Sequence, residues 1–369
     1  MKRFNTTGPC FPDEHYMMPA LDRLPGVREL VAGGNYFVVH APRQTGKTTA
    51  LKALAREINA NGDMAAIYCT LESIQRLVGS YETAMREIRH LVLKSAGLVR
   101  ELASVAREIG DVKSSIGIST AISDALQDLC VRSAKPLVVF FDEADCLVGD
   151  ALISFLRQLR DGYVNRDMMP FPKSIALVGM LDVRDYKAQI RPDGQSLGQI
   201  SPFNIIAEDL LIPNFTEADI AALYAQHTTE TGQRFADGVV EDVWRWTRGQ
   251  PWLVNAIAND CVAKIHGNRY GETITVDDVE AAKEAIIREN PVHLDYLFYM
   301  ANSQWIKPLV EAGFQGKLND EQRDEKTYKV LMGFGLFRDV EGTLEFANQL
   351  YEEYWKKMIA PVALFTNDN

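Results

Sequence analysis

The chain of 369 residues lacks any long hydrophobic run. Its longest compact apolar segment, LVVFF at 137–141, has the length of a strand. A helix needs about 18 uninterrupted apolar residues to span a bilayer. The opening segment, MKRFNTTGPCFPDEH, also lacks the apolar centre of a secretion signal. The sequence therefore predicts no membrane partner.

Cysteine is scarce and scattered. The five cysteines stand at positions 10, 69, 130, 146 and 261, and no two of them form a CxxC pair. This spacing indicates neither a zinc site nor a disulfide framework. Reduced thiols are typical of a cytoplasmic protein, and we expect that location.

An excess of positive charge is absent as well, because the formal net charge is −11. A dedicated nucleic-acid binder usually carries a basic domain or a basic stripe. The acidic balance disfavours DNA as a partner, although a local basic patch stays open.

Short apolar runs rich in β-branched and aromatic residues predict five strands, of which the first and third read as buried. They are YFVVHA (36–41), MAAIYCTLE (64–72), PLVVFF (136–141), SIALVGML (174–181) and NIIAEDLLIPNF (204–215). Helical periodicity fills the gaps between them, from Gly46 to about Asn59, over 74–134 and over 151–163. Strands that are apolar throughout and alternate with helices predict an α/β fold, with a parallel sheet covered on both faces.

Beyond Pro213 the pattern becomes helical. Four helices are expected over 216–232, 236–249, 251–266 and 275–290, with Thr216 and Thr275 as N-caps. Further helices follow Pro291, and GLFRDVEGTLEFAN (335–348) then predicts two strands joined at a Glu-Gly turn. Helices closed by such a hairpin suggest a winged helix.

The segment VVHAPRQTGKTTALKAL (38–54) joins an apolar strand to a helix through a glycine-containing turn. Backbone N–H groups at a helix N-terminus bind phosphate, and the helix dipole favours the anion. Lys47 adds a charge for the β- and γ-phosphates, and the Thr48 hydroxyl is a ligand for Mg²⁺. The residues predicted to surround the phosphates are Ala41, Arg43, Gln44, Thr45, Gly46, Lys47, Thr48 and Thr49.

Ala41 stands where the usual G-x-x-x-x-G-K-[ST] pattern has its first glycine. A Cβ atom costs roughly 1–2 kcal/mol where the chain needs a positive φ. We therefore expect a negative φ at Ala41.

The segment LVVFFDEAD (137–145) supplies a second requirement of a P-loop ATPase. Such an enzyme needs a carboxylate at the end of a neighbouring strand to hold Mg²⁺ through water, and Asp142 meets this need. Glu143 can then polarise the attacking water as the general base. Solvated acidic caps are common at strand ends, but this pair lies downstream of a Gly-Lys-Thr loop. Together the two motifs predict that the chain binds ATP or ADP with Mg²⁺.

Several segments resemble prokaryotic AAA-like ATP-binding proteins, in the group that contains the STAND and the Orc/Cdc6-type ATPases. They are HYMMP, VVHAPRQTGKTT, LVVFFDEAD, LVGMLDVRDY, SPFNI and RGQPWLVNAIA, and they run from about residue 4 to 355. The resemblance implies a P-loop core over 36–213, a helical lid over 214–290 and a winged-helix domain over 291–369. It also implies a lead-in over 1–35 that covers the nucleotide.

The resemblance assigns further roles. Gly249-Gln250-Pro251 looks like the STAND Gly-x-Pro motif, whose proline packs near the adenine, although Pro251 is equally the ordinary first residue of a helix. Arg184 stands where STAND proteins place an arginine that senses the γ-phosphate, and a surface ion pair is its alternative role. Tyr16, with His15, either covers the base or only packs.

One departure concerns the arginine finger of oligomeric AAA+ enzymes. The stretch that should carry it, SLGQISPFNI, contains no arginine. Arg157, Arg160 and Arg166 are alternatives, or they belong to a solvated helix face. Hydrolysis that depends on a ring of subunits is therefore in doubt.

Three functions remain open. The chain is a slow ATPase that acts as a nucleotide-controlled switch for a protein partner, or a DNA-associated ATPase of the loader or transposition-regulator type, or a module that assembles other subunits. Residues 291–369 contain eight Lys and Arg against twelve Asp and Glu, a net of −4. Because phosphate neutralisation supplies much of DNA affinity, this balance favours the switch.

Overall fold

The computed structural model describes residues 1–77, 81–111, 117–180, 205–289, 292–304, 306–319, 322 and 326–363. The chain folds as two compact units. The first comprises Met1–Pro19, Pro42–Gly46 and Pro213–Asn369, and the second comprises Ala20–Ala41 and Lys47–Ile212. The start of the chain thus belongs to the same unit as its C-terminal part.

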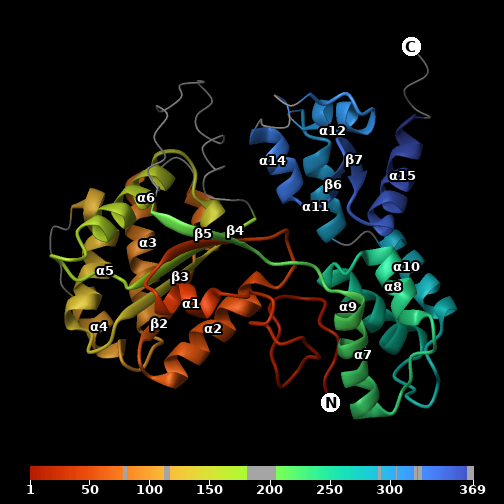
Figure 1. Ribbon diagram of the computed structural model, residues 1–369, viewed down its shortest axis with the longest axis horizontal. Helices are drawn as coiled ribbons and strands as arrows, with labels where there is room; N and C mark the ends of the chain where they lie inside the picture. The colour runs from red at the N-terminus through yellow and green to blue at the C-terminus, as the bar shows by residue number, and fades with distance from the viewer. Residues whose placement is uncertain are drawn as a thin grey trace. The chain divides into compact units, whose positions relative to one another are not determined.

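The second unit contains a five-stranded sheet with the order β2-β3-β4-β1-β5, in which every neighbouring pair is parallel (Figure 1). The strands are β1 (Tyr36–His40), β2 (Ala65–Thr70), β3 (Leu137–Asp142), β4 (Ser174–Gly179) and β5 (Ile206–Leu211). All five predicted strands are present, and the α/β architecture is confirmed.

One helix precedes β1, and the others lie between β1 and β4 along the chain. They are α1 (Val27–Ala32), α2 (Lys47–Asn61), α3 (Tyr81–Ala96), α4 (Ala103–Asp111), α5 (Ala121–Arg132) and α6 (Gly149–Val164), with short 3₁₀ turns η1 (Glu72–Leu77), η2 (Ile118–Thr120) and η3 (Ala144–Cys146).

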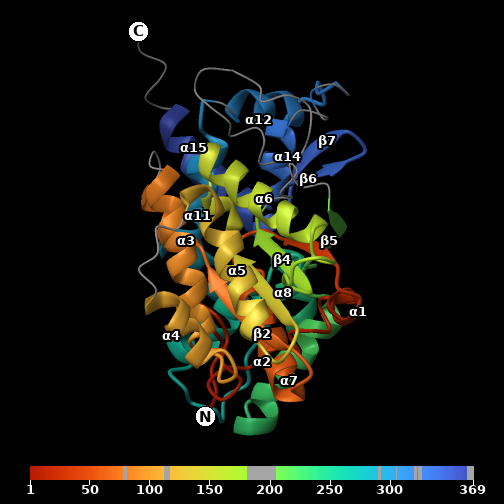
Figure 2. The same ribbon diagram turned by 90° about the vertical axis from the view of Figure 1, so that its left-hand side faces the viewer.

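Apolar contacts are present on both faces of the sheet. Successive residues of a strand point to opposite faces, so one strand can contribute side chains to both. Phe37 of β1 joins a core with Leu51 of α2 and with residues of α1. On the opposite face, Phe141 of β3 packs edge-on against Phe155 of α6, with ring centroids 5.0 Å apart. Figures 1 and 2 show α3, α5 and α6 together on this side of the sheet. In open α/β sheets of this kind, ligands bind outside the carboxyl ends of the strands rather than on a face.

The first unit is mainly helical. Its elements are α7 (Glu217–Thr231), α8 (Val239–Thr247), α9 (Pro251–Asn259), a π-helical turn η5 (Asp260–Ile265), α10 (Val276–Glu289), α11 (Val292–Ala301), α12 (Lys307–Phe314), α14 (Lys326–Gly333), β6 (Phe337–Val340), β7 (Thr343–Phe346) and α15 (Gln349–Ala363). The predicted cap at Thr216 forms a capping box with Asp219. Thr275 similarly exchanges hydrogen bonds with Asp278.

The predicted hairpin is present near the C-terminus. β6 and β7 pair antiparallel, and Glu341 and Gly342 between them have φ values of 49° and 89°. Two positive φ values in a two-residue loop match the twist of the flanking strands. Rings from both strands pack on Trp355 of α15, 6.0 Å away for Phe337 and 5.6 Å for Phe346. The winged-helix assignment itself stays a prediction.

One hydrophobic core runs through the first unit, from Phe4 to Tyr354. A buried cation reinforces it: Lys283 of α10 is 1% exposed and its Nζ lies 2.9 Å from Glu353 Oε2 of α15. The same ammonium lies 4.1 Å from the ring centroid of Trp246 in α8. A buried charge is tolerated only when it is paired, so this contact ties α8, α10 and α15 together.

His266 gives this unit a pH-dependent contact. Its Nδ1 lies 2.9 Å from Glu272 Oε2 and its Nε2 3.0 Å from Asp278 Oδ2. Burial lowers the pKa of His266, but the hydrogen bonds to Asp278 and Glu272 outweigh burial and raise it above the ordinary value. A raised pKa in the folded state stabilises the fold below the unfolded pKa, and this contribution is lost as pH rises through the folded pKa.

We therefore expect the stability advantage of the wild type over His266→Gln to be on the order of 1 kcal/mol at pH 5.5, since hydrogen bonds to charged groups reach that size. The advantage should shrink by pH 9. Urea unfolding of both proteins at each pH measures it. An advantage that grows with pH would contradict the assignment.

The structure describes all five cysteines and joins no two of them in a disulfide. Across the part of the chain that the structure describes, no helix combines the length and the apolar character needed to cross a membrane.

Candidate functional site

The turn after β1 has the backbone conformation of a phosphate cradle. Gln44 and Gly46 both have positive φ, 60° and 97°, and α2 begins immediately afterwards at Lys47. Thr45 fixes the turn, because its Oγ1 donates a hydrogen bond to Pro42 O at 2.8 Å. Glycine accommodates a positive φ at little cost, which explains Gly46.

Ala41 is not among the residues with positive φ, as expected. Its N–H donates to Gly179 O of β4 at 3.3 Å, and its side chain, 1% exposed, belongs to the core that includes Leu51. The Cβ atom therefore packs usefully, and a glycine is not required at this point of the loop.

Lys47 opens α2 with its side chain enclosed. The residue is 6% exposed, and its Nζ donates to Ala41 O at 2.7 Å. The ammonium is thus held over the loop at the helix N-terminus, where the backbone dipole also attracts anions. The ammonium of Lys47 and the N-terminus of α2 would therefore both attract a phosphate group.

Thr48 and Asp142 meet at the same edge of the sheet. Thr48 Oγ1 donates to Asp142 Oδ2 at 2.6 Å, although 94 residues separate them in sequence. Hydroxyl and carboxylate oxygens are the hard ligands that Mg²⁺ prefers. These residues fit the ion: Thr48 would ligate it and Asp142 would hold it through water, as predicted for a P-loop site.

Asp142 does not lie on the strand next to β1, however. β4 stands between β1 and β3 in the sheet order, so the expectation of a neighbouring strand is corrected. The carboxyl ends of parallel strands share one edge of a sheet, which still brings Asp142 to Thr48 across β4.

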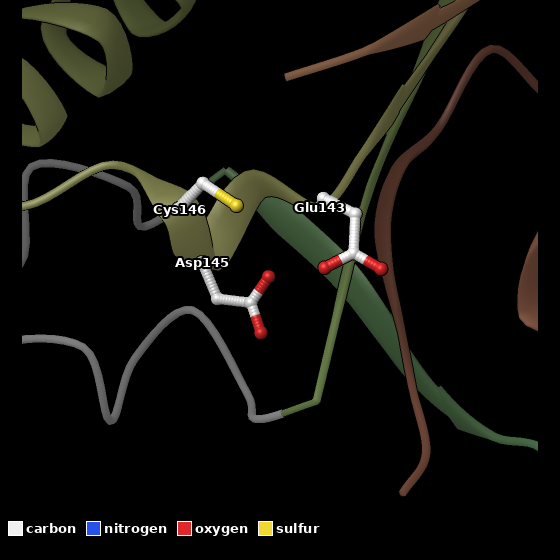
Figure 3. A group of neighbouring side chains, drawn as sticks. All are labelled: Glu143, Asp145 and Cys146. Atoms are coloured by element: carbon white, nitrogen blue, oxygen red, sulfur yellow. The ribbon is translucent and has the colours of Figure 1, made fainter. Parts of the chain in front are cut away.

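Glu143 has a left-handed backbone, with φ 56° and ψ 40°. Such a conformation costs about 1–3 kcal/mol in a residue other than glycine and concentrates at functional sites. Figure 3 shows that the Glu143 carboxylate points toward that of Asp145, and one ligand atom each of Glu143, Asp145 and Cys146 lie within 4.8 Å of one another. The Glu143 carboxylate therefore lies beside the side chains of Asp145 and Cys146.

Asp145 connects this turn to β4. Its Oδ2 accepts a hydrogen bond from Met180 N at 2.9 Å, while its Oδ1 is buried without a hydrogen-bond partner among the described residues. Burial raises the pKa of the Asp145 carboxyl above its ordinary value. Sequence reasoning did not single out this residue.

The remaining predicted site residues occupy varied environments. Arg43 and Gln44 are exposed on the loop, and Thr49 is half-buried in the first turn of α2. Pro251 is the buried first residue of α9, next to the N-cap Gln250. Gln250 Nε2 also lies 3.5 Å from Arg43 O within the first unit. Arg184 lies outside the described residues.

Tyr16 is enclosed in the core of the first unit. It is 2% exposed, and its hydroxyl lies 3.2 Å from His227 Nδ1. The neighbouring His15 accepts a hydrogen bond from Phe11 N at 2.9 Å. Both residues thus have packing roles in the first unit.

The arginines considered as fingers also differ in their surroundings. Arg157 is exposed and Arg160 is half-buried on α6. Arg166 is engaged within its own unit, because its Nη1 donates to Gly34 O at 3.0 Å and its guanidinium lies 4.1 Å from the Tyr163 ring centroid.

Sequence reasoning missed Tyr68 on β2. Its Oη donates to Asp142 Oδ2 at 2.6 Å, the same oxygen that Thr48 contacts. The only signal for it in the sequence is a hydroxyl-bearing ring within the apolar strand MAAIYCTLE.

Comparisons with known proteins complete the description. No protein-family model matches the chain, and no curated protein matches it. Among solved structures, the Walker-type ATPase PABY2304 of Pyrococcus abyssi is similar with a TM-score of 0.59 and 14% identity, over 96% of this chain and 99% of that chain.

Two further structures are similar at lower scores. The Aeropyrum pernix Orc1 protein in complex with DNA gives a TM-score of 0.45 at 14% identity, over 96% of this chain and 97% of that one. The Cdc6p of Pyrobaculum aerophilum gives 0.44 at 13% identity, over 93% of each chain. With the five-stranded parallel sheet, the likeness to the Pyrococcus protein shows that this chain shares the fold of that Walker-type ATPase.

Proposed function

We propose that the chain binds ATP with Mg²⁺ and hydrolyses it slowly. The observation that carries this proposal is the 2.6 Å hydrogen bond between Thr48 Oγ1 and Asp142 Oδ2, directly after the lysine that opens α2. It brings a metal ligand, a metal-orienting carboxylate and a phosphate-binding helix N-terminus to one place. A structural hydrogen bond alone would not require the left-handed Glu143 beside it.

The roles follow from these positions. Lys47 binds the β- and γ-phosphates, and the backbone from Ala41 to Thr49 surrounds them. Mg²⁺, when bound, would neutralise developing charge on the transferred phosphoryl group. Glu143 accepts a proton from the attacking water as general base. Arg184 as γ-phosphate sensor, and Pro251 and Tyr16 near the base, are proposals that rest on the resemblance.

The proposal extends to a switch that acts on a protein partner, as in the STAND part of the resemblance. ATP and ADP states would reposition the helical and winged-helix domains and so expose or hide a partner surface. The net charge of −11 supports a switch over a DNA-associated ATPase, and the arginine-free stretch SLGQISPFNI disfavours hydrolysis that depends on a ring of subunits. Self-association would be the simplest form of partnership. The scattered cysteines, none in a CxxC pair, are typical of a cytoplasmic protein.

Small-angle scattering combined with size-exclusion chromatography tests the switch. Samples with ADP and with a non-hydrolysable ATP analogue should differ in radius of gyration or in mass. Lys47→Ala serves as the control that should show no difference between the nucleotides. Identical profiles for the wild type with both nucleotides would refute the switch while leaving ATP binding untouched.

The DNA-associated alternative predicts tight binding of duplex DNA, whereas we expect weak binding. Cations in the C-terminal region have acidic partners: Arg338 lies 2.6 Å from Glu345, and Lys356 lies 2.6 Å from Glu352. DNA affinity scales with the number of phosphates neutralised, and non-specific binding lies near 10⁻⁴–10⁻⁶ M at physiological salt. We expect this chain to bind a mixed-sequence duplex in that range or more weakly.

Fluorescence anisotropy with and without ATP measures this affinity. Submicromolar binding that falls steeply with salt and is lost in Arg338→Glu would favour the DNA-associated ATPase instead.

A further inference from the structure

Tyr68 reaches the Asp142 carboxylate through the register of the sheet. In the parallel pair β2–β3, Thr70 is opposite Asp142, and Tyr68 stands two residues earlier on β2. Residues two apart on a strand share a face, and an aromatic side chain can reach a diagonal neighbour across strands. The Tyr68 hydroxyl therefore arrives at Asp142 Oδ2, 2.6 Å away.

The hydrogen bonds of Asp142 leave little freedom to its carboxylate. Oδ2 accepts from Thr48 and from Tyr68, and Oδ1 accepts from Glu143 N at 3.0 Å. An ionised carboxylate has about four acceptor sites. Three donors thus leave roughly one site, which a water molecule on Mg²⁺ can fill.

The direction of the Tyr68 hydrogen bond is fixed. The Tyr68 hydroxyl donates to Asp142 Oδ2, because an ionised carboxylate can only accept hydrogen bonds. Lys52 Nζ lies 4.9 Å from the centroid of the same ring, so α2 also helps to hold the tyrosine in place.

We propose that Tyr68 is a positioning residue for Mg²⁺, which orients Asp142 so that its free acceptor site meets the water on the ion. This inference rests on the proposed function. Thr48 would ligate the ion when Mg²⁺ is bound, whereas the Tyr68 hydroxyl donates to the carboxylate of Asp142. Tyr68 then holds Asp142 in the same orientation before and after the metal arrives. Partners of this kind typically change metal affinity or activity by about 10–100-fold when removed.

The test compares Tyr68→Phe with Tyr36→Phe. Tyr36 is a matched control because it lies on β1 of the same sheet, is fully buried and donates its hydroxyl to Pro172 O at 3.0 Å. Mg²⁺ is titrated into each protein saturated with a non-hydrolysable ATP analogue, and the heat of binding is recorded. Tyr68→Phe should weaken apparent Mg²⁺ affinity by about 10–100-fold. Tyr36→Phe should leave it unchanged.

Nucleotide binding in EDTA is the control for a general loss of structure, because such a loss would weaken it. It should be the same in Tyr68→Phe and in the wild type, with matching circular dichroism spectra. Equal Mg²⁺ affinity in Tyr68→Phe and Tyr36→Phe would overturn the inference, as would equal weakening in both. A wild type that binds no nucleotide would instead overturn the proposed function, so the two failures are distinguishable.

Discussion

Glu143→Gln is expected to bind ATP normally and to hydrolyse it at least tenfold more slowly, since a general base contributes about 10²–10⁴ to a rate. The amide keeps the size of the side chain but cannot accept the proton of the attacking water. Because φ at Glu143 is already 56°, the substitution adds no new backbone strain. Phosphate release under single-turnover conditions measures the effect.

Glu217→Gln is the matched control for this substitution. Glu217 is exposed in the first turn of α7, in the other compact unit. Its variant should hydrolyse ATP at the wild-type rate. Wild-type turnover in Glu143→Gln would show that another group acts as the base. Asp145, the carboxylate beside Glu143, would then be tested by Asp145→Asn.

Lys47→Ala is expected to abolish measurable ATP binding while the fold persists. The ammonium is 6% exposed and is held at the helix N-terminus by Ala41 O. Each hydrogen bond to a charged group contributes about 1.5–3 kcal/mol, which is roughly a tenfold to hundredfold change in affinity. If Lys47 contacts two phosphates as proposed, its removal should weaken ATP affinity at least about a hundredfold.

Fluorescent-nucleotide binding, together with circular dichroism, checks this prediction. Lys94→Ala removes an exposed lysine near the end of α3 and should change neither measurement. Unchanged affinity in Lys47→Ala with an intact spectrum would show that the phosphates bind elsewhere.

The strands and the loop were predictable from sequence because their signals are local. Apolar runs such as YFVVHA and LVVFF identify buried strands, and β1 and β3 begin or end within about a residue of the predicted limits, well inside the usual ambiguity of strand and helix ends. The Glu341-Gly342 turn was predictable for the same reason, since a glycine between two short apolar runs is a local sign of a hairpin turn. A glycine-containing turn before a helix is likewise recognised from adjacent residues.

Contacts that depend on sheet order or register were not predictable. The position of β4 between β1 and β3 follows from how the whole sheet assembles, so Asp142 was expected one strand too close. The hydrogen bonds of Tyr68 to Asp142 and of Asp145 to Met180 N join residues 74 and 35 positions apart. A single sequence carries no periodic signal for such pairs.

Tyr16 illustrates the same limit in the first unit. Its contact with His227 bridges 211 residues, and only the folded core shows that the ring is enclosed. The capping box of Thr216 with Asp219 was accessible, by contrast, because three residues separate the partners.

Isothermal titration calorimetry of the wild-type chain with ATP, in Mg²⁺ and in EDTA, tests the central claim most directly. The site at Lys47, Thr48 and Asp142 predicts saturable, stoichiometric binding that is tighter with Mg²⁺ and that disappears in Lys47→Ala. Absence of saturable binding under both conditions, or equal binding by Lys47→Ala, would contradict the claim that this loop holds a nucleotide.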